Sequence, residues 1–465
     1  MFRTFLPLTF LLAATVFAQN REIPEAPAVT GSAVPKMGVS LSSSDDRRQN
    51  VSAQTPPTTS AAPGTQSASG PLVTLEQAIQ LAIANNPDLK ASRTQVDQNQ
   101  AQEITANLRP NPTLSGDSQF LPIFNPSQFT TDTLDTLSQF DVGFGYLFER
   151  GGKRKRRLKA AQDATSVTRF QVADAERTLT FNVAQQFVNA LLAKSNLNFA
   201  TADLDSFQQT VNISEERYKA GDISEGDLLK IKLQLLTFQT DVAQARVAKA
   251  QALVSLRQLL GYASVPRDYD IAGELEYQPL RSGLDDLQAK ALKERPDLRA
   301  ARLSVTAAES QVALARANGK QDVSASMNVS HVSGATSASW FISMPLPIFD
   351  RNQGEIKRTM FAATQSTFAA TSAEEGALTD VRNAWEAALS NQEIVQLYMS
   401  GYLKQAQDSR DITNYAYKGG AATLLDLLDA ERSYRSVQLG YRQALANYML
   451  SLEQLRQAVG TRNLP

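Results

Sequence analysis

The chain has 465 residues and a formal net charge of −1, and no long block of like charge dominates it. This balance argues against nucleic acid as a partner. The absence of cysteine and the single histidine exclude disulfides, iron–sulfur clusters, thiol catalysis and thiolate zinc sites.

The first residues predict a cleaved secretory signal peptide at Met1–Ala18. One arginine precedes an apolar stretch from Phe5 to Phe17, and the small side chain of Ala18 suits a signal peptidase. An N-terminal membrane anchor is the alternative, but the stretch is shorter than the roughly 20 residues of a spanning helix. Residues 19–71 are rich in Pro, Ser, Ala, Thr and Gln, which predicts a disordered leader.

From Thr74 onward the chain repeats itself, since four segments recur in the same order. The first copies read NNPDLKASR, FERGGKR, VAQQFVNALL and YKAGDISEGDLL; the second copies read ERPDLRAAR, FDRNQGE, VRNAWEAALS and YKGGAATLLDLL. Such self-similarity indicates a tandem duplication. The expected units are a first repeat at 72–262, a linker at 263–283, a second repeat at 284–460 and a C-terminal tail at 461–465.

Each repeat contains two strand-like segments with alternating side chains. In FDVGFGYLFE, Phe140, Val142 and Phe144 share one face, whereas Asp141 and Gly143 share the other. One apolar face and one face of small polar residues are typical of a transmembrane β-strand between lipid and a wet lumen. A soluble sandwich fits this pattern about as well, but the signal peptide and the long polar helices favour the membrane. The strands are expected at about 113–121, 138–148, 322–331 and 337–347.

Four strands cannot form a complete membrane structure by themselves. An open sheet would leave its edge groups unpaired in lipid, and four strands are too few to close a barrel. If these strands span a membrane, several chains must contribute to one barrel.

Very long helices follow the strands in both repeats. Residues 153–219 and 354–416 show an uninterrupted helical pattern, equivalent to a rod of roughly 100 Å each. Their narrow apolar stripes favour helix-on-helix packing in a coiled-coil-like tube. The shorter return helices could make up the length by stacking on short helices. The return helices are expected at 222–261 and 421–460, and the short helices at 296–317 and 75–108.

The repeated turns, at about 218–229 and 417–429, predict helix reversals. Gly221 and Gly420 suit the left-handed position just past a helix end. Ser224 and Thr423 stand three residues before Asp227 and Asp426, as N-caps stand before an acid in the first turn. Capping therefore explains both acids.

A third acid of the second turn is not explained by capping. Asp429 lies one helical turn beyond Asp426 and on the same face. In a symmetric ring of chains these two carboxylates would form stacked acidic rings.

The duplicated plan and especially YKGGAATLLDLLDA resemble the TolC family of bacterial outer-membrane efflux ducts, over nearly all of residues 72–460. The resemblance implies a mainly α fold with a transmembrane β-barrel portion. Three chains, with four strands each, would close a twelve-stranded barrel that continues as a long periplasmic α-helical barrel. It implies a bacterial outer-membrane location that extends into the periplasm. It further implies a homotrimer working with a periplasmic adaptor (membrane fusion protein) and an inner-membrane pump of the resistance-nodulation-division type.

The resemblance also assigns roles to residues of the two turns. It places the channel gate at Asp426, Asp429 and Tyr417, and the adaptor-facing tips at Gly221, Asp227, Gly420 and Thr423. The gate arginine of the family is replaced by Ala422 here. Its link to Asp227 is therefore missing, and closure must be held differently or more weakly.

A narrower resemblance points to the cobalt–zinc–cadmium resistance branch of the family. It rests on RPNPTLSGD before the first strand and FERGGKRKRR after the second. The basic residues of the latter stand at a helix start, where the helix dipole disfavours them. They could contact anionic headgroups of outer-membrane lipid; a solvated collar is the alternative. These residues are Lys153, Arg154, Lys155, Arg156 and Arg157.

No catalytic constellation emerges, so the chain is expected not to be an enzyme and to need no cofactor and no built-in metal site. The expected function is a passive exit duct of a tripartite efflux system, with heavy-metal cations as candidate cargo. A soluble periplasmic coiled-coil adaptor or scaffold is the alternative function.

Overall fold

The computed structural model describes residues 70–463 apart from 122, 129 and 137. The expected signal peptide, the leader up to residue 69 and the last two residues of the tail lie outside the described residues. Among the described helices, none combines the length and the apolar character that a membrane-spanning helix requires.

The same series of elements occurs twice along the chain. In the first half it comprises α1 (Leu75–Asn85), α2 (Pro87–Asn107), β2 (Thr113–Gln119), β3 (Gln139–Phe148), α4 (Lys153–Ala220) and α5 (Glu225–Leu260). In the second it comprises α6 (Leu284–Glu294), α7 (Pro296–Asn318), β5 (Val323–Val332), β6 (Ala335–Ser343), α8 (Gln353–Leu397), α9 (Leu403–Lys418) and α10 (Leu424–Val459). A short 3₁₀ turn (Pro126–Gln128) and α3 (Thr131–Thr136) lie between β2 and β3.

Local sequence signals explain where the first helices begin. Thr74 forms the expected capping box, since its hydroxyl accepts from the Gln77 N–H and the Gln77 side chain accepts from the Thr74 N–H. Pro87 occupies the first turn of α2, where no intrahelical N–H is needed. Asn86 caps this helix by accepting from the Leu89 N–H at 3.0 Å.

The four long strands form one antiparallel sheet in the order β2-β3-β5-β6. Its register places Val142 beside Val329 and Phe144 beside Met327, while Gly143 lies beside Asn328. Apolar side chains therefore continue across one face and small polar ones across the other. In the single chain the apolar face is uncovered: Trp340 is 76% exposed and Ile342 is 80% exposed.

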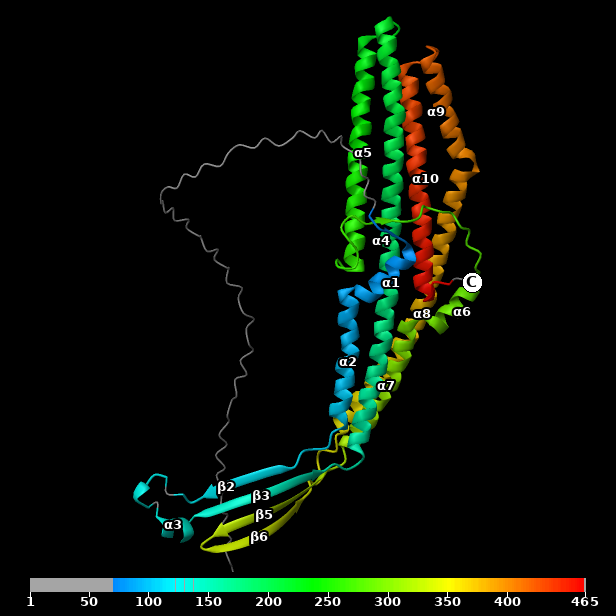
Figure 1. Ribbon diagram of the computed structural model, residues 1–465. Coiled ribbons are helices and arrows are strands. Elements are labelled where there is room, and N and C mark those ends of the chain that lie inside the picture. The colour runs from blue at the N-terminus through cyan, green and yellow to red at the C-terminus, as the bar shows by residue number, and fades with distance from the viewer. Residues whose placement is uncertain (1–69, 122, 129, 137, 464–465) are drawn as a thin grey trace, which may run out of the picture. The chain divides into compact units, whose positions relative to one another are not determined.

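The sheet and the two helix hairpins lie at opposite ends of the helices (Figure 1). Near the middle, the parallel pair β1 (Leu72–Val73) and β4 (Asp270–Ile271) packs on the main apolar core. This core brings together Val183 and Phe187 of α4 with Leu256 and Leu260 of α5.

The return helices stack end to end on the short helices. The Asn86 side chain donates to the Leu259 carbonyl at 3.0 Å, which places the end of α5 at the start of α2. The Arg295 guanidinium donates to the Ala458 carbonyl at 3.0 Å, which places the end of α10 at the start of α7. Each return helix thus stacks within its own repeat (Figure 1).

The expected uninterrupted helix at 354–416 is wrong in one place. A π-helical turn at Tyr398–Tyr402 separates α8 from α9, and within it Gly401 has φ +138°. Residues with a Cβ rarely adopt this φ, so the glycine permits the interruption. The ring of Tyr398 lies against Gly440 of α10, where a side chain would occupy the same space. In the first repeat α4 runs without interruption over 68 residues.

Two glycine substitutions test this packing with opposite signs. In Gly440→Ala the added Cβ would lie 2.5 Å from the Tyr398 hydroxyl, so we expect a loss of stability of about 1–3 kcal/mol. In Gly376→Ala, within α8, the Cβ meets nothing within 4 Å, and better helix propensity should add about 0.5–1 kcal/mol. Thermal unfolding of the two purified variants measures both effects. Equal shifts in the same direction would contradict the close packing of Tyr398 on Gly440.

Candidate functional site

The first hairpin turn joins α4 to α5 by local contacts. Gly221 has φ +82° and ends α4 in the left-handed conformation, as its position in the sequence predicts. Ser224 caps α5 by accepting from the Asp227 N–H at 3.1 Å. The Asp227 carboxylate accepts from Ser224 and Lys230, and these hydrogen bonds hold the pKa of Asp227 below its usual value.

The second turn, between α9 and α10, is capped more completely. Gly420 has φ +78°, and Thr423 and Asp426 form a reciprocal capping box. The Asp426 carboxylate accepts from the Thr423 hydroxyl at 2.6 Å and from its N–H at 3.0 Å. These bonds lower the pKa of Asp426, so the structural role expected for this acid is present.

Asp429 has no comparable local role. Its side chain is exposed, and no hydrogen bond or ion pair engages it within the described part of the chain. Because Asp426 is exposed as well, the two carboxylates are presented to solvent one turn apart on α10.

Tyr417 connects the two hairpins from a buried position. The residue is 3% exposed and packs with Phe207, Phe238 and Leu427 in an apolar cluster beneath the turns. Its hydroxyl lies 3.3 Å from the Ser214 hydroxyl of α4. The tyrosine expected at the gate is thus part of the packing between the two repeats.

Arg217 makes the direct connection between the turns. Its guanidinium donates to the Tyr417 carbonyl at 2.6 Å and lies over the Tyr417 ring at 5.1 Å from the centroid. The arginine that the family has at position 422 is absent, and Ala422 instead packs half-buried against the apolar cluster. Within one chain, a cation of the first hairpin therefore holds the second, a connection that the sequence did not indicate.

A buried cluster of charges lies farther along the same helices. Arg435 of α10 forms ion pairs with Asp203 of α4, at 2.9 Å, and with Asp241 of α5. The Arg435 guanidinium also covers the Phe238 ring at 4.3 Å from the centroid. Burial raises the pKa of Asp203 in spite of this partner. The cluster ties the first repeat to the second through charge.

Glu431 is the most perturbed member of this cluster. It is 7% exposed, and burial raises its pKa to about 7. Arg410 of α9 opposes this rise, whereas the Asp203 carboxylate adds to it. One signal of the cluster was visible in the sequence, because Asp203 stands at the helical spacing of Phe199 and Phe207 and interrupts an apolar stripe.

The basic residues at the start of α4 differ in whether they form ion pairs. Lys153 pairs with Asp322 at 2.7 Å, and Arg157 pairs with Glu149 at 2.8 Å. The other three cations, Arg154, Lys155 and Arg156, have no ion pair among the described residues. The run is therefore not a uniform collar.

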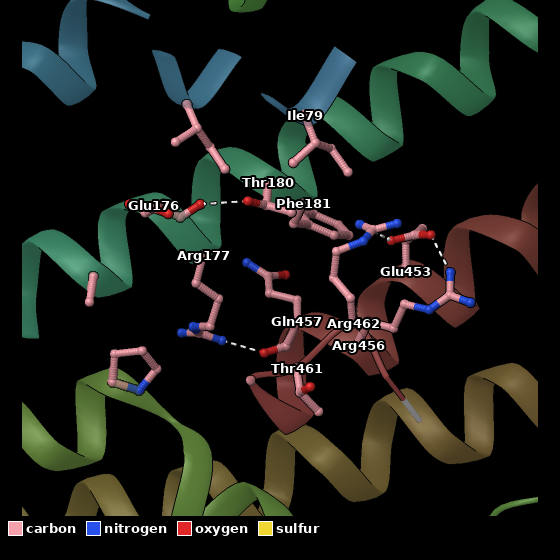
Figure 2. A pocket seen from close by; sticks show the side chains of 14 residues that line it. Ile79, Glu176, Arg177, Thr180, Phe181, Glu453, Arg456, Gln457, Thr461 and Arg462 are labelled. Atoms are coloured by element: carbon pink, nitrogen blue, oxygen red, sulfur yellow. Dashed lines mark hydrogen bonds and ion pairs between the residues drawn. The ribbon is translucent and has the colours of Figure 1, made fainter. Parts of the chain in front are cut away.

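A pocket of about 340 Å³ lies between the two repeats, at the level where α10 ends (Figure 2). Its apolar wall includes Ile79 and Phe181, but its charged groups already have partners in the protein. Arg456 and Arg462 both contact the buried Glu453, and Arg177 donates to the Gln457 carbonyl. Because these charges already have partners, the pocket is interpreted as part of the packing between the two repeats and not as a ligand site. Among the described residues, no group of three or more His, Cys, Asp and Glu side chains could hold a metal ion.

Comparisons with known proteins agree over most of the chain. The family model described as "Outer membrane efflux protein" matches residues 78–262 and 287–461. The cobalt-zinc-cadmium resistance protein CzcC of Cupriavidus metallidurans is 27% identical, over 80% of this chain and 86% of its own length. The pyoverdine export outer membrane protein OpmQ of Pseudomonas aeruginosa is 25% identical, over 83% of each chain. A solved structure of CusC has the same fold, with a TM-score of 0.68 and 22% identity over 83% of this chain and 92% of that chain.

The buried charge cluster predicts a pH dependence of stability. The pKa of Glu431 is about 7 when folded but 4.5 in its ordinary environment, so the folded state binds more protons between these values. Stability attributable to this group is therefore present at about pH 4.5 and is lost as the pH rises through 7. We expect Glu431→Gln to abolish this loss, which amounts to at most about 3 kcal/mol.

Melting temperatures of both proteins, measured from pH 5 to pH 8, provide the check. Glu375→Gln, at an exposed position of α8, is the matched control and should follow the wild type. Parallel profiles for wild type and Glu431→Gln would show that Glu431 is not held in its protonated form.

Proposed function

The chain belongs to the outer membrane efflux protein family, and we propose that it is the passive outer-membrane exit duct of a tripartite efflux system. An inner-membrane pump of the resistance-nodulation-division type would supply the energy, and a periplasmic adaptor would join pump to duct. Members of this family are transport channels of the outer membrane, so we expect no catalytic turnover. The soluble adaptor considered as an alternative is not favoured.

The uncovered apolar face of the sheet is the observation that carries this proposal. In a water-soluble protein this face would need a covering layer, whereas lipid can cover it directly. The described strands β2 and β6 each have one neighbour, so each leaves an edge unpaired. Pairing β6 of one copy with β2 of the next would satisfy both edges. Three copies would then close a twelve-stranded barrel.

The helices support the same assembly. Exposed apolar residues follow a heptad spacing on α5, including Leu229, Leu233 and Leu236. Others, such as Ile412 and Tyr415, lie on α9. Helix α5 packs on α4 of the first repeat, and α9 packs on α10 of the second. The two exposed surfaces therefore belong to different repeats. A head-to-tail contact between them would close a ring of helices continuous with the barrel.

The hairpin turns suit both a gate and a docking surface. In a three-fold ring, Asp426 and Asp429 would repeat as two layers of carboxylates at the periplasmic end of the duct. Tyr417 would serve the gate by holding the second hairpin against Arg217 of the first. The exposed Leu425 at the tip offers an apolar contact to the adaptor, beside Gly221, Asp227, Gly420 and Thr423.

We further propose heavy-metal cations as the cargo. The support is the likeness to CzcC, whose name specifies cobalt, zinc and cadmium resistance. The similar likeness to OpmQ, a pyoverdine exporter by name, makes an organic cargo the competing assignment.

The proposed gate predicts how the channel responds to polyvalent cations. Asp429→Asn should weaken block of single-channel current by trivalent cations, and adding Asp426→Asn should weaken it further, because both substitutions remove charge from the acidic rings. Asp429→Asn is the cleaner probe, since Asp426 also caps α10. Planar-bilayer recordings measure the block. Asp97→Asn, at an exposed position of α2, is the control, and unchanged block in Asp429→Asn would remove these residues from the gate.

The cargo is tested by a growth-inhibition panel on a deletion strain and on the same strain complemented with the wild-type gene. We expect sensitivity to zinc, cobalt, cadmium or copper salts, and little change toward dyes, bile salts and antibiotics. Sensitivity to the organic compounds alone would retain the duct and discard the metal cargo. Unchanged growth in every condition would contradict the efflux function.

A further inference from the structure

A cavity of about 330 Å³ lies where the end of β3 meets the start of α4. Its wall combines the aromatic end of the strand, the connection from α2 to β2 and the first turn of the long helix. The lining residues are Arg109, Pro110, Tyr146, Leu147, Phe148, Glu149, Gly152, Lys153, Arg154 and Lys155.

The cavity carries positive charge that the protein itself does not neutralise. Of its four cations, Lys153 is held by Asp322 at 2.7 Å. The acidic residue of the cavity wall, Glu149, pairs with Arg157, which also donates to the carbonyls of Ala106 and Leu108. No carboxylate among the described residues engages the remaining three cations, Arg109, Arg154 and Lys155.

The first turn of α4 adds to this potential. Gly152 provides no side-chain cap, and the first turn contains no acid. The corresponding helix of the second repeat, α8, begins in the same left-handed conformation at Asn352. There, Glu355 lies in the first turn and pairs with Arg358 at 2.6 Å. Of these two corresponding helix starts, that of α4 therefore carries cations with no acid in its first turn.

Aromatic side chains place the cavity at a defined depth. Tyr146 and Phe148 form an edge-to-face pair with centroids 4.9 Å apart and belong to the apolar face of the sheet. If the sheet spans the outer membrane as proposed above, its helix-bearing end faces the periplasm. Aromatic residues at such an end mark the interface where lipid phosphates lie.

We propose that this cavity binds the phosphate headgroup of an anionic phospholipid of the inner leaflet, with Arg109, Arg154 and Lys155 as its ligands. Tyr146 and Phe148 would contact the glycerol and the start of the acyl chains. A phosphate diester supplies the acceptor oxygens that arginine and lysine bind best, and its charge offsets theirs. The site rests on the proposed membrane duct, and a symmetric trimer would contain three such sites.

Lipid titration of the full-length protein, purified in mild detergent, tests the site. Phosphatidylglycerol, phosphatidylcholine and inorganic phosphate are added separately, and bound molecules are counted by native mass spectrometry. We expect wild type to prefer phosphatidylglycerol. The double variant Arg154→Gln/Lys155→Gln should bind it about thirtyfold more weakly, since each cation near an anionic lipid contributes about fivefold in affinity. Arg109→Gln alone should reduce binding about fivefold.

Arg156→Gln/Lys357→Gln is the matched control, because it removes the same number of cations near helix starts but none from the cavity. Equal weakening in both double variants would overturn the site in favour of a diffuse collar. Equal binding of phosphatidylglycerol and phosphatidylcholine would also overturn it, as would saturation by inorganic phosphate alone.

Channel conductance of the same samples separates this proposal from the duct itself. If the wild type conducts normally but shows no preference for phosphatidylglycerol, the lipid site is refuted and the duct is retained. A wild-type protein that forms no conducting pore would refute the duct.

Discussion

The constraint on which the proposed duct depends is that a four-stranded sheet in lipid would have unpaired edges. Each backbone N–H and C=O in the hydrocarbon region must be hydrogen-bonded, because no water is available there. One chain offers an apolar face that lipid can cover, but the outer edges of β2 and β6 remain open. Copies of the same chain can supply the missing partners, so membrane insertion and assembly are coupled in the proposed duct. The exposed apolar side chains of α5 and α9 likewise require a neighbouring copy to cover them.

The two repeats share the same series of elements, and the proposed functional sites lie where the repeats differ. Both turns end a helix with a left-handed glycine and begin the next with a hydroxyl cap. The second presents a free carboxylate at Asp429, where the first has Lys230 at the corresponding position. Only the second long helix contains the π turn around Gly401, whereas the first begins with a run of cations and no acid in its first turn. In the proposed duct, the gate would therefore lie on one copy of the duplicated scaffold and the cationic cavity on the other.

Charge as well as apolar contact holds the two halves together beneath the turns. Arg217 reaches the backbone of Tyr417, and Arg435 lies between Asp203 and Asp241. Desolvation offsets much of the attraction in such buried pairs, so their net contribution to stability is smaller than their short distances suggest. Burial of Glu431 beside these pairs raises its pKa to about 7. A buried carboxyl group of α10 near the proposed gate is therefore expected to change its protonation close to neutral pH.

Short-range features of the sequence determined the strands, their two faces, the helix caps and the glycine turns. Alternation along FDVGFGYLFE and the caps at Thr74 and Thr423 involve residues a few positions apart, so spacing alone reveals them. The tertiary structure decided which distant residues meet. It showed that Arg217 contacts Tyr417, that Arg435 joins Asp203 to Asp241, and that Tyr398 packs on Gly440 where the helix is interrupted. These contacts depend on how the helices pack side by side, and no periodicity within one segment specifies the partner that a neighbouring helix provides.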